Sequence, residues 1–199
     1  MSFTIFLTMF SFALVMSISP GPVNMMILTS SINNGFAKTF RFISGATIGF
    51  ILLLLAIGLG LSKVINIYPD ILFYIKIFGF TFIMYMGYKI ITSKASLSIE
   101  ENDTMNLKFY QGFLLQWLNP KAWIACISVV SMYSSVELFT IFVIIYFFVC
   151  YVSLSLWGVV GSKVTKIFDT DFKLRLFNIV MGLILIVCAL SMIFVNIFS

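Results

Sequence analysis

The sequence predicts an all-α integral membrane protein whose six transmembrane helices form two inverted three-helix repeats with proline-broken first helices. Three observations support this fold class. The 199 residues are 61% hydrophobic and 10% charged, with a mean hydropathy of +1.13, whereas a soluble domain is about 25% charged. Six apolar stretches approach or exceed the roughly 20 residues that a helix needs to cross a bilayer. Two of these stretches contain a proline break at corresponding places in the two halves.

The first stretch, residues 3–32, is uncharged but about ten residues too long for one straight helix. The run Ser19-Pro20-Gly21-Pro22 explains the excess, because proline removes a backbone donor and clashes with the preceding turn. The fourth stretch is broken in the same way at Asn119-Pro120. The remaining boundaries follow from apolar length and predict spans at 42–62, 71–91, 110–133, 138–160 and 177–198, with a polar linker over about 92–108.

The linker divides a single predicted domain, 1–199, into one repeat over about 3–91 and a second over about 109–198. Each repeat begins with a broken span, continues with a glycine-bearing span and ends with an apolar third span. An odd number of spans in each repeat forces the two halves into opposite orientations.

Basic residues predict how the chain is oriented. The loops predicted on one side of the membrane contain a single basic residue, Lys63, and two more basic residues, Lys76 and Lys121, lie within spans. The positive-inside rule therefore places the other nine in the cytoplasm and both termini outside. It also accounts for the net charge of +5, so nucleic acid is not an expected partner, whereas the lipid bilayer is. The nine are Lys38, Arg41, Lys89, Lys94, Lys108, Lys163, Lys166, Lys173 and Arg175.

The first break has the composition of a binding site. Pro20 and Pro22 free backbone carbonyls, and Gly21 allows a ligand or another backbone to approach closely. Asn24 lies at the start of the following half-helix, whose N-terminal amides can bind an anionic group such as a carboxylate. In lipid, an unwound backbone is tolerated only where it is buried in protein or lines a wet cavity. A simple proline kink in a packed helix is the alternative.

The second break holds Gln116, Asn119, Pro120 and Lys121. A lysine inside a bilayer costs about 2.5–3.5 kcal/mol on insertion scales. Lys121 lies roughly 18 Å into its span at 1.5 Å per residue, which is too deep for easy snorkelling. We therefore expect it to pair with a carboxylate or to take part in coupling.

Other residues have simpler interpretations. We expect Gly45, Gly49, Gly79 and Gly87 to be close-packing positions between helices. Lys76 can snorkel to the outer interface. Most aromatic residues should serve packing, with Trp123 and Tyr85 as weak candidates for ligand contact.

The residue inventory excludes several function classes. The chain has no histidine, no acidic residue inside a predicted span, and no CxxC pair. We therefore expect no metal site, no cofactor and no enzymatic activity. A cationic cargo would need a buried carboxylate, so a neutral zwitterion fits best. Any proton relay would have to use Lys121, Lys76, a tyrosine hydroxyl or the amine of the substrate.

These residues resemble the LysE/RhtB family of amino-acid exporters. The resemblance lies in Ser19-Pro20-Gly21-Pro22 with Asn24, in Gly45-xxx-Gly49, in Tyr85-Met86-Gly87 with Lys76 and Gly79, and in Asn119-Pro120-Lys121-Ala122. It implies a carrier of the bacterial inner membrane that exports amino acids by antiport, with protons of the proton motive force as coupling ion. It places the substrate site at Pro20, Gly21, Pro22, Asn24, Asn119, Pro120 and Lys121, to which the polar Gln116 is added, and leaves open a homo-oligomer.

Three other functional hypotheses compete with that of an amino-acid exporter. A thiol–disulfide electron carrier would need a cysteine near each break, and only Cys126 follows one. A cation or heavy-metal exporter would need buried carboxylates. An accessory membrane subunit without transport activity would have a wholly lipid-like interior, which the polar residues of the two breaks oppose.

Overall fold

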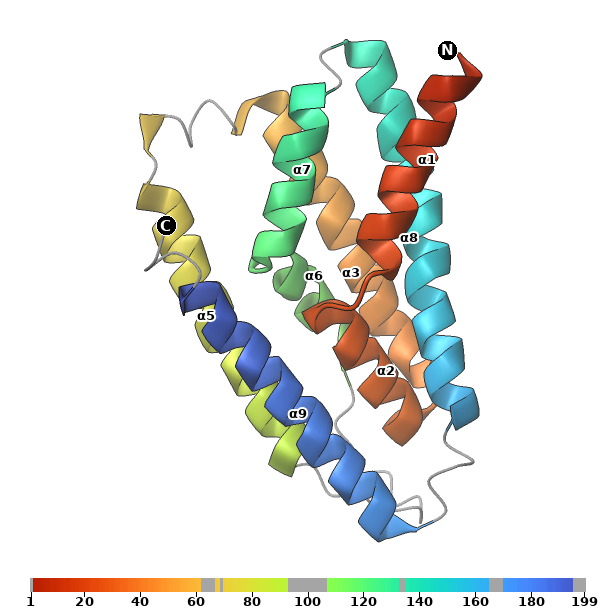
Figure 1. The fold of residues 1–199 in the computed structure, drawn as a ribbon, viewed down its shortest axis with the longest axis vertical. Coiled ribbons are helices and arrows are strands. Elements are labelled where there is room, and N and C mark those ends of the chain that lie inside the picture. Colours follow the sequence, from red (N-terminus) through yellow and green to blue (C-terminus); the bar gives the residue numbers. More distant parts are fainter. Residues whose placement is uncertain are drawn as a thin grey trace.

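The computed structural model describes residues 2–61, 67–68, 70–92, 107–132, 135–164 and 170–194. All regular structure within these ranges is helical (Figure 1). Most of the predicted linker, residues 93–106, lies outside the described residues. The described part contains eight α-helices and one π-helical turn: α1 (Phe3–Ile18), α2 (Pro22–Asn34), α3 (Phe36–Ala56), η1 (Ile57–Leu61), α5 (Asp70–Thr92), α6 (Phe109–Trp117), α7 (Pro120–Met132), α8 (Val136–Val164) and α9 (Asp171–Phe194).

Both predicted helix breaks are present. The backbone of Ser19 is extended and Pro22 begins α2, so that α1 and α2 meet at 57°. In the second half α6 ends at Trp117, and α7 begins at Pro120 at an angle of 63°. A proline at the first helical position loses no hydrogen bond, which is why each new half-helix can start there.

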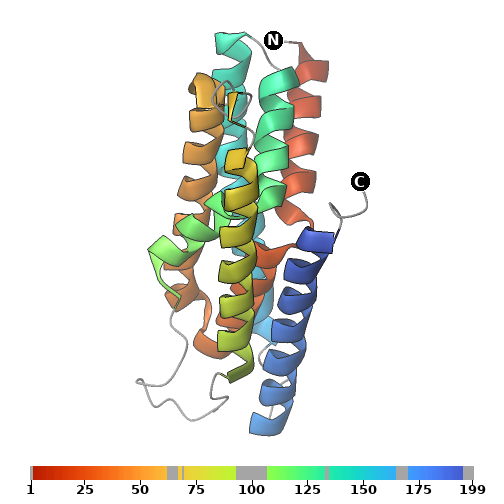
Figure 2. The same ribbon diagram turned by 90° about the vertical axis from the view of Figure 1, so that its left-hand side faces the viewer.

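Most of the helix packing joins the two halves of the chain, although α2 also packs on α3. The long helix α3 packs against α6 and α8, while α8 also packs against α1 and α2. Helices α5 and α9 form a pair that leans away from the other helices and lies side by side in both views (Figures 1 and 2). The broken helices therefore belong to the larger group and pack on α3 and α8.

Close approach of helices occurs at the four glycines predicted as packing positions. A Cβ atom on Gly45 would collide with the carbonyl of Phe109, and one on Gly49 would lie 2.9 Å from the Phe113 Cα. A Cβ on Gly79 would collide with the Leu118 carbonyl, and one on Gly87 would lie 3.0 Å from the carbonyl of Gly182. These contacts support the predicted packing role, because any larger side chain would force the helices apart.

The start of two helices differs from the prediction. Helix α3 begins at Phe36 rather than at residue 42, and α9 begins at Asp171 rather than at 177. Lys173 therefore lies in the first turn of α9 and Arg41 in the second turn of α3, although the sequence placed them in loops. Both side chains are exposed, and a long basic side chain can extend so that its charge stays in water although its backbone already belongs to the helix. Only Gly35, whose φ of 79° favours glycine, separates α2 from α3.

By length and apolar character alone, fewer than six segments of the described residues qualify as membrane spans. Among the described residues, Phe36–Gly60 and Val136–Val164 are long and apolar enough to cross a membrane. Counting each bent pair, α1 with α2 and α6 with α7, as one span raises the number to four. Within α5, residues Ile77–Thr92 form a shorter apolar helix.

Candidate functional site

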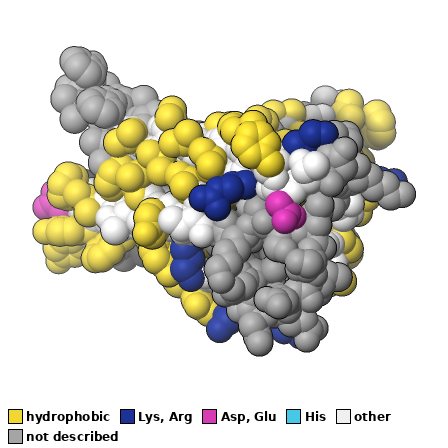
Figure 3. All heavy atoms as spheres, turned by 90° about the horizontal axis from the view of Figure 1, so that it is seen from below, with side chains coloured by type: hydrophobic (Ala, Val, Ile, Leu, Met, Phe, Trp, Pro, Cys, Tyr) yellow, Lys and Arg dark blue, Asp and Glu magenta, His cyan; other side chains and the backbone are white. Residues whose placement is uncertain are grey.

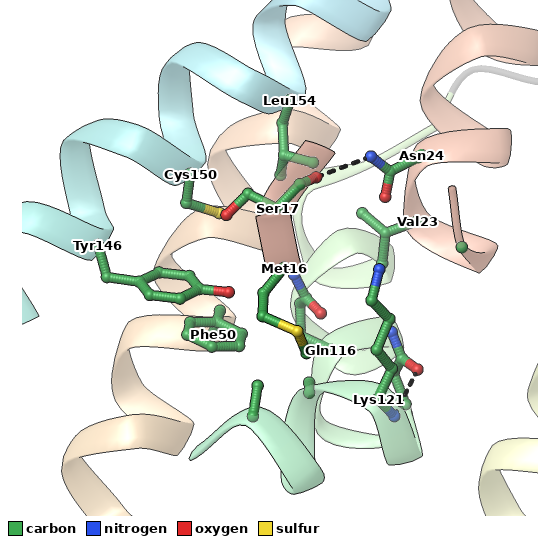
Figure 4. Close-up of a pocket in the computed structure, with 14 residues that line it drawn as sticks. Met16, Ser17, Val23, Asn24, Phe50, Gln116, Lys121, Tyr146, Cys150 and Leu154 are labelled. Atoms are coloured by element: carbon green, nitrogen blue, oxygen red, sulfur yellow. Dashed lines mark hydrogen bonds between the residues drawn. The ribbon is translucent and has the colours of Figure 1, made fainter. Parts of the chain in front are cut away.

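A small cavity lies between the two breaks, and both halves of the chain line it (Figure 4). Its volume is about 30 Å³. On the same measure a water molecule needs roughly 10–15 Å³. The cavity in this conformation therefore has room for a few water molecules but not for an amino acid.

The carbonyls that the first break frees are held by side chains from three different helices. Asn24 Nδ2, from α2, donates to the Ser17 carbonyl at 2.9 Å, and Trp157 Nε1, from α8, donates to the Ile18 carbonyl at 3.0 Å. Lys121 Nζ, from α7, donates to the Ser19 carbonyl at 2.9 Å. The last three carbonyls at the end of α1, which have no amide of their own helix to bind, are thus capped by side chains from other helices.

Lys121 connects the two breaks directly. Its ammonium also donates to Ser19 Oγ at 2.7 Å, and the C-terminal end of a helix favours a positive charge. A Cβ atom on Gly21 would lie 3.6 Å from the Cδ and Nζ atoms of Lys121, so the lysine chain passes close to this glycine. The described residues that line the cavity include no Asp or Glu.

The second break is capped locally. Asn119 Oδ1 accepts a hydrogen bond from the backbone amide of Lys121 at 3.1 Å, which makes Asn119 the N-cap of α7. Trp123 Nε1 donates to the Trp117 carbonyl at 2.6 Å. All these partners lie within six residues of one another in the chain, so the second break holds its own shape.

The predicted site residues divide into those that line the cavity and those that shape it. Pro20 and Pro22 form the first break, with Pro22 buried at the start of α2, and neither lines the cavity. Pro120 starts α7, and its side chain lies outside the described residues. The predicted site residues that line the cavity are Gly21, Asn24, Gln116, Asn119 and Lys121.

The start of α2 has unpaired backbone amides beside the cavity. Gly21 is its N-cap and has no side chain to cap the helix, so the amides of Val23 and Asn24 lack an intrahelical acceptor. Both residues line the cavity. The side-chain nitrogen of Asn24 donates to the Ser17 carbonyl of α1, whereas its side-chain oxygen makes no hydrogen bond with the described residues. The N-terminus of α2 can therefore receive an anionic group.

The sequence did not predict the wall opposite Lys121. Tyr146, Cys150 and Leu154 project from α8, and Phe50 projects from α3. The ring of Tyr146 stacks on that of Phe50 with centroids 4.2 Å apart and an interplanar angle of 9°. The spacing of four residues along α8 could have indicated this wall, because it places the polar Tyr146 and Cys150 on one helix face.

The weaker candidates lie elsewhere. Tyr85 is 47% exposed and lies under the ammonium of Lys89, 5.4 Å from its ring centroid. Trp123 forms a hydrogen bond across the second break, to the Trp117 carbonyl, and does not line the cavity. The side chain of Lys76 lies outside the described residues.

Comparison with known proteins adds independent information. Residues 14–195 match the model of a family described as LysE type translocator. Curated relatives named cysteine/O-acetylserine efflux protein are 27% identical in Escherichia coli O157:H7 and 26% identical in Escherichia coli O1:K1, each over 94% of this chain and 96% of the relative. The Salmonella typhimurium protein of the same name is 26% identical over 90% of this chain and 92% of its own length. No solved structure matches the chain.

Proposed function

Since this chain belongs to the LysE type translocator family, we propose that it exports neutral amino acids or related small metabolites across the bacterial inner membrane, driven by the proton motive force. Members of this family are transporters and not enzymes. The relatives with which the chain shares about nine tenths of its length or more are efflux proteins for cysteine and O-acetylserine. Both of those molecules carry an α-carboxylate and an α-ammonium group.

The composition of the cavity is the observation that carries this proposal. A carboxylate would be held by the Lys121 ammonium and by the free amides at the start of α2, both of which favour negative charge. The carboxamide oxygens of Asn24 and Gln116 would accept from an α-ammonium group without a formal negative charge. Nothing in the described lining would neutralise a second positive charge on the cargo, so lysine, arginine and divalent metals should be poor cargo.

Transport requires the cavity to open and close. An amino acid does not fit into about 30 Å³, so the structure represents a contracted state of the site. Widening would separate Lys121 from the Ser19 oxygens, and the carboxylate of the cargo would take their place. When the site is empty, the two Ser19 oxygens thus occupy the position beside the Lys121 ammonium that the carboxylate of the cargo would take.

The arrangement of helices supports an inverted repeat. Each half consists, in order, of a bent helix pair, a long helix and a further helix. Helices α1 and α2 run down the view of Figure 1, whereas α6 and α7 run up. The packing is also reciprocal, because α3 packs on α6 just as α8 packs on α1. We therefore retain six spans in two inverted repeats as part of the proposal.

The basic residues support an orientation with both termini outside. Figure 3 looks at the end of the molecule where α5 and α8 end and α9 begins, and shows Lys and Arg side chains there. All seven described members of the predicted cytoplasmic set are exposed at this end of the helices. On the positive-inside rule this end faces the cytoplasm. The seven are Lys38, Arg41, Lys89, Lys108, Lys163, Lys173 and Arg175.

An efflux assay tests the proposal. Cells that express the chain would be preloaded with a panel of amino acids by feeding dipeptides, and export would be followed with and without a protonophore. We expect faster export of small neutral amino acids than from cells with the empty vector, and loss of this difference with the protonophore. Export of lysine faster than that of every neutral amino acid tested would overturn the neutral-cargo assignment.

A further inference from the structure

We infer that Tyr146 and Ser17 select the side chain of the cargo and favour one that carries a small hydroxyl group over the apolar side chain of the same shape. This inference rests on the proposed export of neutral amino acids. It adds two residues to the binding site, from α8 and α1, that the two breaks do not contain.

The two residues lie at the opposite end of the cavity from the carboxylate site. Figure 4 shows Lys121 on one side and Tyr146 with Cys150 on the other, with Ser17 beside Cys150. The Tyr146 ring points its hydroxyl group toward the interior of the cavity. A cargo whose carboxylate lies at Lys121 would therefore extend its side chain toward Tyr146.

The hydroxyl groups at this end are almost fully enclosed and lack regular partners. Ser17 is 5% exposed, and its Oγ atom makes no hydrogen bond with the described residues. Tyr146 is 2% exposed, and its hydroxyl group lies near that of Ser17 without forming a hydrogen bond of good geometry with it. A buried polar atom without a partner costs about 1–3 kcal/mol, so a partner supplied by the cargo would recover that energy.

Tyr146 cannot turn away from the cavity without a large change. Its ring stacks against Phe50 and contacts Phe142 at a centroid distance of 5.5 Å. Cys150, one turn further along α8, is held by a contact of its sulfur with Thr47 Oγ1 at 4.0 Å. These contacts fix the position of the phenol, and a fixed donor discriminates between cargoes better than a mobile one.

The rest of this wall limits size. Phe50, Met16 and Leu154 surround the Tyr146 and Ser17 hydroxyl groups with apolar atoms. A side chain of two or three heavy atoms with a hydroxyl group would fill this end of the cavity and satisfy the buried oxygens. An apolar group of the same shape would leave them unpaired, and a site built around a hydrogen bond rejects such analogues strongly.

Threonine and valine provide the sharpest test, because they differ only in a hydroxyl group in place of a methyl group. Export of both would be measured for the original chain, Tyr146→Phe and Ser17→Ala, normalised to the amount of protein in the membrane. We expect the threonine-to-valine ratio of export rates to exceed one in the original chain. It should fall about fivefold or more in Tyr146→Phe, the loss of one hydrogen bond.

Tyr151→Phe is the matched control. Tyr151 also lies on α8, but its hydroxyl group bonds to Ser44 and does not line the cavity, so the ratio should not change. Export of both amino acids with a ratio that neither Tyr146→Phe nor Ser17→Ala alters would overturn this inference and leave the proposed function standing. Absence of any neutral amino-acid export from the original chain would instead overturn the proposed function.

Discussion

The two helix breaks have similar bends, 57° and 63°, but they are stabilised in different ways. At the first break the carbonyls of Ser17, Ile18 and Ser19 are bonded by side chains from α2, α8 and α7. Two of these partners are 139 and 102 residues away in the chain. At the second break every cap comes from within six residues. The first break therefore depends on the packing of the whole molecule, whereas the second does not.

This difference assigns different roles to the two breaks. A break whose caps come from other helices must exchange hydrogen bonds when those helices move. A break with local caps can move as a rigid unit. We therefore expect the first break to change shape during transport while the second carries Lys121 as a fixed anchor. Proline explains both bends, but the residue that follows it differs, because Val23 follows Pro22 and Lys121 follows Pro120.

The energies explain how a lysine is tolerated at this depth. Burial of the ammonium group costs about 2.5–3.5 kcal/mol. A hydrogen bond to a charged group contributes about 1.5–3 kcal/mol, and Lys121 makes two of them with Ser19. The two bonds can thus offset the cost of burial, provided that the first break keeps its shape.

Replacement of Lys121 should have the largest effect. Lys121→Met keeps an unbranched side chain only one atom shorter but removes the charge and both bonds to Ser19. We expect export to fall about ten- to a hundredfold, which corresponds to the loss of one charge-assisted hydrogen bond to the cargo. Efflux rates normalised to membrane-inserted protein measure this effect. Lys89→Met is the control, because Lys89 is exposed at the end of α5. Equal export by Lys121→Met and Lys89→Met would remove Lys121 from the site.

A pair of tryptophans separates the two kinds of capping. Trp157→Phe deletes the bond to Ile18 at the first break, and Trp123→Phe deletes the bond to Trp117 at the second. Neither residue lines the cavity. Each change should lower stability by about 1 kcal/mol, seen as a lower midpoint of thermal unfolding in detergent. Export per folded molecule should change about threefold or more for Trp157→Phe, on the scale of that one bond, and stay constant for Trp123→Phe.

The opposite pattern, with export altered only by Trp123→Phe, would reverse the assignment of the two roles. Equal effects on export would show that the distinction between local and distant caps has no functional meaning. Because both variants make the same chemical change, differences in side-chain volume cannot explain a difference between them.

Local signals explain why the two breaks and the long apolar helices could be predicted. Proline acts on its own turn, and apolar length reports directly on a helix that spans lipid. Helix starts were less accurate, because Lys38 and Arg41 look like loop residues although they lie in the first turns of α3. The role of Asn119 also follows from a local pattern, since Asn before Pro is typical of a helix N-cap followed by the first helical residue. The family resemblance placed Asn119 in the substrate site, and in the structure its carboxamide oxygen caps α7.

Contacts between distant segments could not be predicted in the same way. The bonds of Lys121 to Ser19 join residues 102 positions apart, and no spacing in the sequence indicates them. Tyr146 lies in an apolar run where an aromatic residue is usually a packing residue. Only the packing of α8 against α1 and α3 shows that its hydroxyl group reaches the cavity.

The smallest effect is expected at Gly21, and it tests why a glycine occupies the first break. Its φ of −166° and ψ of 176° are accessible to any residue, and an added Cβ would only contact the Lys121 side chain at 3.6 Å. Gly21→Ala should therefore change the free energy of unfolding by less than about 0.5 kcal/mol, and lower export by about twofold because a methyl group enters the cavity.

Gly35 provides the contrast, because no atom lies within 4 Å of an added Cβ but its φ is 79°. Gly35→Ala should destabilise the protein by about 1 kcal/mol or more through backbone strain alone, while Gly21→Ala should not. Thermal unfolding of the two variants beside the original chain measures this difference. A loss of stability in Gly21→Ala as large as that in Gly35→Ala would show that the first break needs glycine for its backbone. Its role would then not be to leave space for Lys121 and the cargo.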